Sequence, residues 1–91
     1  MAHTTREKTK LLNRVRRIRG QIEAIERALE EEKGCSRVLQ LIAGVRGAVN
    51  GLMAEVLEDH IHLHVADPAL ASNKRTEGAA ELIDVVRAYL R

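Results

Sequence analysis

Residues 11–29 decide the fold of this chain and read LLNRVRRIRGQIEAIERAL. Apolar side chains recur in this stretch at alternating spacings of four and three, which is the pattern of a long α-helix with one apolar seam. The seam consists of Leu11, Val15, Ile18, Ile22, Ile25 and Leu29. We expect this helix to stop near Lys33, with Gly34 in the left-handed conformation that helix ends favour.

The next apolar stretch repeats the same spacing and predicts a second helix. Its seam consists of Val38, Ile42, Val45, Val49, Leu52 and Val56. Ser36 is the expected N-cap, and the dipeptide Asp67-Pro68 is the expected end. Two long helices with matching seams predict an antiparallel hairpin. Glycines inside a helix are unfavourable, so we expect close helix–helix approach at Gly44, Gly47 and Gly51.

A short third helix is expected near the C-terminus. A polar connection runs through Ser72, Asn73 and Lys74, and apolar residues then recur at helical spacing. Those residues are Ala79, Leu82, Ile83, Val86 and Leu90. No stretch has the alternation of a strand, so the sequence predicts an all-α fold with one domain over residues 1–91.

The composition favours an oligomer and argues against an enzyme. In 91 residues there is no Phe or Trp, and Tyr89 is the only aromatic residue, so the rings that usually anchor a monomeric core or an enzyme pocket are missing. A chain this short buries little surface alone, and we expect burial to be shared between subunits. No apolar run is long enough to span a membrane, so we expect a cytoplasmic protein. In a reducing compartment, Cys35 is a thiol or a metal ligand.

The first predicted helix is strongly basic. Glu7 is the single acid among seven basic residues between positions 6 and 19. At 100° per residue, one exposed face carries Arg6, Lys10, Arg14 and Arg17. Such a run is either a solvated face or a surface for a polyanion, and the scarcity of acids favours DNA held through its phosphates. The candidate DNA-binding residues are Arg6, Lys10, Arg14, Arg16, Arg17, Arg19, Arg37 and Arg46.

A second group of residues predicts a metal site. His60 and His64 lie four residues apart, so two imidazoles share one helix face, although two solvated histidines would have the same spacing. Cys35 precedes His60 by 25 residues, which is nearly 40 Å of continuous helix, so the two cannot share a metal within one chain. Two second helices packed antiparallel about a two-fold axis would bring Cys35 of one copy beside His60 and His64 of the other. The hairpin returns His3 to the same place.

This donor set suits some metals better than others. One thiolate with several nitrogen donors, to which the N-terminal amine would add one more, favours Ni(II), Co(II) or Zn(II) over Cu(I). His62 points to the opposite helix face and is expected to be a surface residue.

Four features together resemble the CsoR/RcnR family of bacterial metal- and formaldehyde-responsive repressors, over essentially the whole chain. They are RVRRIRGQI at 14–22, Cys35, VRGAVNGLM at 45–53 and EVLEDH at 55–60. The resemblance implies a three-helix protomer and an antiparallel dimer that assembles into a dimer of dimers. It also implies binding to double-stranded operator DNA and release of the DNA when an effector binds.

Within this family, His3, Cys35, His60 and His64 resemble the ligands of the nickel/cobalt-sensing branch, which controls metal efflux. The copper branch has a second cysteine where this chain has His64. Nickel/cobalt members can carry an acidic residue where this chain has Leu63, so the exact coordination is left open. Formaldehyde sensors of the family also use Cys35, together with an N-terminal proline where this chain has Ala2.

Three other functions stay as alternatives. The first is a formaldehyde-responsive repressor that acts through Cys35 and the N-terminal amine. The second is a purely structural helical oligomer. The third is an enzyme with a Cys/His nucleophile and base, for which the chain has neither a Gly-rich phosphate loop nor a Ser/His/Asp pattern.

Overall fold

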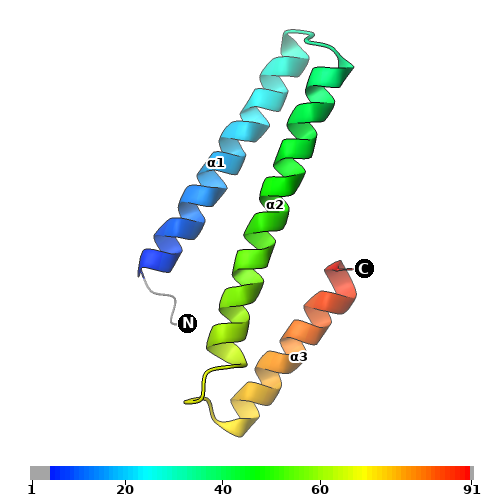
Figure 1. The fold of residues 1–91 in the computed structure, drawn as a ribbon. Helices are drawn as coiled ribbons and strands as arrows, with labels where there is room; N and C mark the ends of the chain where they lie inside the picture. The colour runs from blue at the N-terminus through cyan, green and yellow to red at the C-terminus, as the bar shows by residue number, and fades with distance from the viewer. Residues whose placement is uncertain (1–4, 91) are drawn as a thin grey trace. The chain divides into compact units, whose positions relative to one another are not determined.

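The computed structural model describes residues 5–90, with side chains from residue 7 onward, and the regular elements in that range are three α-helices. They are α1 (Thr5–Glu30), α2 (Cys35–His64) and α3 (Ser72–Tyr89), as Figure 1 shows. The chain divides into two compact units, the first extending to Met53 and the second beginning at Ala54. The predicted all-α fold is confirmed, whereas a single domain over the whole chain stays a prediction.

The first unit is a helical hairpin made of α1 and the first part of α2. The two helices run side by side in opposite directions (Figure 1). Ile18 and Ala28 are the buried apolar side chains in the part of the chain described, and other inward-facing apolar residues are half-buried. The half-buried residues are Leu11, Ala24 and Ile25 on α1 and Val38, Leu41, Val45, Ala48 and Leu52 on α2.

Each predicted seam splits into an inner and an outer row. Every second seam residue is exposed, including Val15, Ile22 and Leu29 on α1 and Ile42 and Val49 on α2. Two helices can cover each other on one side only, so the outer half of each seam is left exposed in a single chain. We call these five exposed residues the outer rows.

The turn between α1 and α2 differs from the prediction. The amide of Lys33 donates to the carbonyl of Ala28 at 3.0 Å, and that of Glu32 donates to Leu29 at 3.2 Å. These two bonds form a Schellman cap, with Glu32 in the left-handed position at a φ of 52°. The helix therefore ends at Glu30. The sequence had predicted this cap at Gly34, and the structure has it two residues earlier, at Glu32.

Gly34 instead begins the second helix. Its carbonyl accepts the first helical hydrogen bond, from the amide of Val38 at 3.2 Å, and its own φ is 95°. Gly34 thus occupies the N-cap position, and Cys35 is the first helical residue. The prediction of Ser36 as N-cap is wrong because Ser36 lies within the first turn.

In the second unit, α2 ends three residues before the predicted Asp67-Pro68 stop. The amides of Val65 and Ala66 both donate to the carbonyl of Ile61, at 3.1 and 2.7 Å, and these bonds close the helix after His64. Asp67 then forms a local turn, in which its Oδ1 accepts a hydrogen bond of 2.9 Å from the amide of Ala69.

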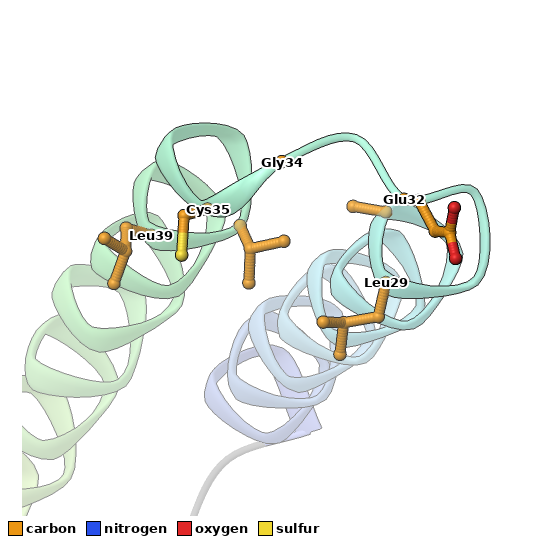
Figure 2. Close-up of a pocket in the computed structure, with 7 residues that line it drawn as sticks. Leu29, Glu32, Gly34, Cys35 and Leu39 are labelled. Atoms are coloured by element: carbon orange, nitrogen blue, oxygen red, sulfur yellow. The ribbon is translucent and has the colours of Figure 1, made fainter.

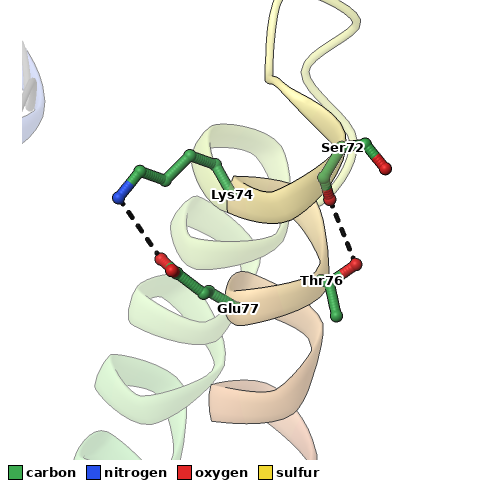
Figure 3. A network of polar contacts seen from close by, with 4 residues as sticks. All are labelled: Ser72, Lys74, Thr76 and Glu77. Carbon is green, nitrogen blue, oxygen red and sulfur yellow. Dashed lines mark hydrogen bonds and ion pairs between the residues drawn. The ribbon is translucent and has the colours of Figure 1, made fainter.

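The third helix begins earlier than predicted. Its first turn is polar, and this polar stretch had been expected to form a loop. Ser72 begins α3, and the predicted loop residues form the first turn rather than a connection. Figure 3 shows two contacts along this turn. The Thr76 hydroxyl donates to the Ser72 carbonyl at 3.1 Å, and Lys74 pairs with Glu77 at 3.4 Å. An exposed helix face with local contacts needs no apolar residues, so the polar composition was misleading.

Gly78 joins α3 to the end of α2. It is the buried residue of α3, and a Cβ atom built on it would overlap the carbonyl oxygen of His64 and lie 2.7 Å from the carbonyl carbon. Only a residue without a side chain permits this approach of the two backbones.

Candidate functional site

Two histidines face the same way at the C-terminal end of α2. The ring centroids of His60 and His64 lie 5.0 Å apart, with an angle of 40° between the planes, and both residues are half-buried. This is the arrangement expected from the i, i+4 spacing, and it places two imidazoles where one ion is able to bind both.

The His60 ring makes a hydrogen bond to the third helix. Its Nε2 lies 2.9 Å from the carbonyl oxygen of Gly78, whose position is fixed by the close packing of α3 against His64. The sequence did not predict this contact. Its only signal was a glycine inside an otherwise regular helix, 18 residues after His60.

The described residues alone do not complete a metal site around the two histidines. Among residues 5–90, no group of three or more His, Cys, Asp or Glu side chains is placed to hold a metal. Cys35 is the first residue of α2 and His64 is the last, and the predicted ligand His3 lies outside the described residues. The imidazole pair fits a borderline metal chemically, but further donors are required.

His62 lies apart from this pair. Its side chain is 69% exposed, and its Nε2 is 3.9 Å from the carboxylate of Glu58. The structure thus places His62 on the surface, as the sequence analysis expected.

Cys35 lies at the edge of an apolar pocket of about 330 Å³ in the first unit (Figure 2). The thiol is free and exposed. Leu29 from the end of α1 and Leu39 from α2 line the pocket, together with Ala28, Glu32, Gly34 and Val38. This pocket was not predicted, although the last apolar residue of α1 and the first apolar residues of α2 line it.

Most of the predicted DNA-binding residues lie on the surface. The exposed ones are Lys10, Arg16, Arg17 and Arg19 on α1 and Arg37 and Arg46 on α2. Arg16 donates a hydrogen bond of 3.2 Å to Asn13, one turn earlier. The side chain of Arg6 lies outside the described part.

Arg14 departs from the predicted exposed face. It is half-buried, and a Cβ atom at Gly51 would lie 2.9 Å from its Nη1 atom. The absence of a side chain at Gly51 leaves room for this guanidinium against α2. The predicted close approach of the two helices is therefore not seen inside the chain: the end of a side chain lies at Gly51, and a Cβ at Gly44 or Gly47 would lie no nearer than 4.0 Å to the other helix.

Among the residues that the structure describes, none of the helices combines the length and the apolar content that crossing a membrane requires.

Comparison with known proteins identifies relatives over the whole chain. The family described as metal-sensitive transcriptional repressor matches residues 7–88. A transcriptional repressor RcnR homolog from Escherichia coli is 41% identical, and an uncharacterized protein from the bioA 5′ region of Serratia marcescens is 54% identical; each match covers all of both chains.

A solved structure has the same fold. It is a glutamate-to-histidine variant of the formaldehyde-responsive regulator FrmR from Salmonella enterica serovar Typhimurium, with a TM-score of 0.88 and 46% identity. The match covers 97% of this chain and 99% of the FrmR chain. With matches to its sequence and to its fold over nearly its full length, the chain belongs to the metal-sensitive transcriptional repressors of the CsoR/RcnR family.

Proposed function

We propose that this repressor binds operator DNA in its metal-free state and releases it on binding Ni(II) or Co(II), which derepresses metal efflux genes in the cytoplasm. The observation that carries the proposal is the His60–His64 pair, whose rings lie 5.0 Å apart on one face of α2. Two imidazoles with one thiolate favour a borderline divalent metal, and Zn(II) is the other candidate.

The remaining ligands in this proposal come from Cys35 of a second subunit and from His3. Two observations support a shared site. The described residues of one chain supply no third donor beside the histidines, and the outer rows leave apolar surface on the hairpin for another copy. An antiparallel dimer, itself paired into a tetramer, would satisfy both requirements.

The exposed basic residues serve as the DNA-binding surface in this proposal. Lys10, Arg17 and Arg46 are exposed, and the long side chains of these residues reach phosphates without reading bases. Thermodynamic linkage requires metal to bind the DNA-free tetramer more tightly than the DNA complex, by a coupling free energy of about 1–3 kcal/mol.

The test follows binding of the protein to the promoter fragment upstream of its own gene by fluorescence anisotropy, with Ni(II), Co(II), Zn(II), Cu(I) and formaldehyde added separately. Release by nickel or cobalt alone is expected, and H64A and C35A should abolish it while still binding DNA. H62A is the matched control because His62 is an exposed histidine on the same helix. Release from C35A by nickel at the wild-type concentration would refute the mechanism.

A second candidate is a response to formaldehyde, which the match to FrmR and the exposed Cys35 thiol favour. One formaldehyde molecule would join the N-terminal amine to the Cys35 sulfur of a neighbouring subunit through a methylene bridge. The amine and the thiol each lose one hydrogen, which leave with the formaldehyde oxygen as water. The cross-linked product would gain the mass of one carbon atom, which mass spectrometry of wild type and C35A detects.

A further inference from the structure

The third helix contributes a backbone group to the histidine pair. The carbonyl oxygen of Gly78 lies 2.9 Å from Nε2 of His60. A carbonyl only accepts hydrogen bonds, so the His60 nitrogen must donate, and the proton resides on Nε2. In the neutral ring, Nδ1 then keeps its lone pair and is the atom able to bind a metal.

The packing of α3 fixes where this carbonyl lies. Gly78 is buried, and its Cα is so close to the end of α2 that an added Cβ would overlap the His64 carbonyl and lie 3.0 Å from the His64 Cβ. Gly78 therefore packs against the backbone of His64, and its carbonyl accepts a hydrogen bond from the ring of His60. Any larger residue at position 78 would push α3 away and lengthen the bond to His60.

We propose that Gly78 is a positioning residue for the effector metal, because its carbonyl holds His60 as the Nε2–H tautomer and leaves Nδ1 to coordinate. The inference rests on the proposed function, in which His60 is a ligand. Histidine ligands of metals commonly donate their second ring N–H to a carbonyl or carboxylate, and loss of that partner costs about 10–100-fold in metal affinity.

The same bond links α3 to the metal. Coordination at Nδ1 withdraws electrons from the imidazole and makes Nε2–H a stronger donor to Gly78. By reciprocity, a metal that strengthens the contact is itself bound more tightly when α3 is in place. We expect the amides of α3 to exchange more slowly with solvent when Ni(II) is bound.

The first test reads the tautomer in the metal-free protein. Nitrogen-15 spectra of histidine-labelled protein should show an unprotonated Nδ1 and a protonated Nε2 for His60. G78A should shift His60 toward a mixture of tautomers and weaken Ni(II) binding about 10–100-fold in competition with a chelator. G20A is the matched control, since a Cβ at Gly20 meets nothing within 4 Å, and it should leave both readings unchanged.

A second pair of variants keeps the proposal testable if G78A does not fold. A glutamine amide can replace the Nε2–H donor but not the Nδ1 ligand, so H60Q should lose Ni(II) affinity while α3 keeps its slow amide exchange. H60A should lose both. Two results would overturn the positioning role of Gly78. One is the same rate of amide hydrogen exchange in α3 for H60Q and H60A, and the other is a neutral His60 ring protonated on Nδ1 in the wild type. Wild-type Ni(II) affinity in H64A would instead refute the proposed metal site. It would not change the conclusion about the tautomer of His60.

Discussion

Replacing Ile22 with alanine should weaken self-association of the repressor. Ile22 lies in the outer row of α1 with 52% of its surface exposed in the single chain. Full burial of an isoleucine side chain contributes about 1.5–3 kcal/mol, so covering the exposed half contributes about 1 kcal/mol per subunit. A two-fold interface contains the residue twice, which gives about 2 kcal/mol, or roughly a 30-fold change in the dissociation constant.

Sedimentation equilibrium of wild type and I22A over a range of concentrations measures this change. Alanine is the stronger helix former, so the variant helix itself should not be weakened. E23A is the control, because Glu23 is the exposed neighbour of Ile22 and carries no apolar side chain. A dissociation constant that I22A leaves unchanged would refute the idea that the chain assembles through its outer rows.

Three further predictions concern local features. E32G should raise the free energy of unfolding by about 1 kcal/mol in urea titrations, because glycine adopts the left-handed φ of 52° at Glu32 without strain. R17A should weaken DNA binding equally on all sequences and lower the slope of log K against log salt by about 1, whereas K74A on α3 should change neither. D67A removes the acceptor for the amide of Ala69 and should cost about 0.5–1.5 kcal/mol in thermal unfolding; an unchanged melting temperature would mean that the turn holds without this bond.

The existence of the helices was predictable because apolar residues spaced three and four apart indicate an α-helix. The seams of residues 11–29 and 38–56 predicted α1 and α2, and the same spacing predicted that His60 and His64 share a face. The ends of the helices were less predictable. The cap at Glu32 uses backbone amides alone, so no side chain marks it in the sequence.

The contacts between helices could not be predicted from the sequence. Nothing near Arg14 shows that its guanidinium lies against Gly51 rather than in solvent, since helical periodicity gives the direction of a residue and not the path of a long side chain. The bond from His60 to Gly78 depends in the same way on how α3 folds back onto α2.

The scarcity of buried side chains among residues 5–90 would make the stability of the fold depend on protein concentration if the chain self-associates. Ile18 and Ala28 are the buried apolar side chains of the described part, which is a small core for a hairpin of two long helices. If a second copy supplies most of the missing burial, the melting temperature rises with protein concentration. A newly made chain would then stay open to proteolysis until it meets a partner, so the cellular level of repressor would help to set its own lifetime.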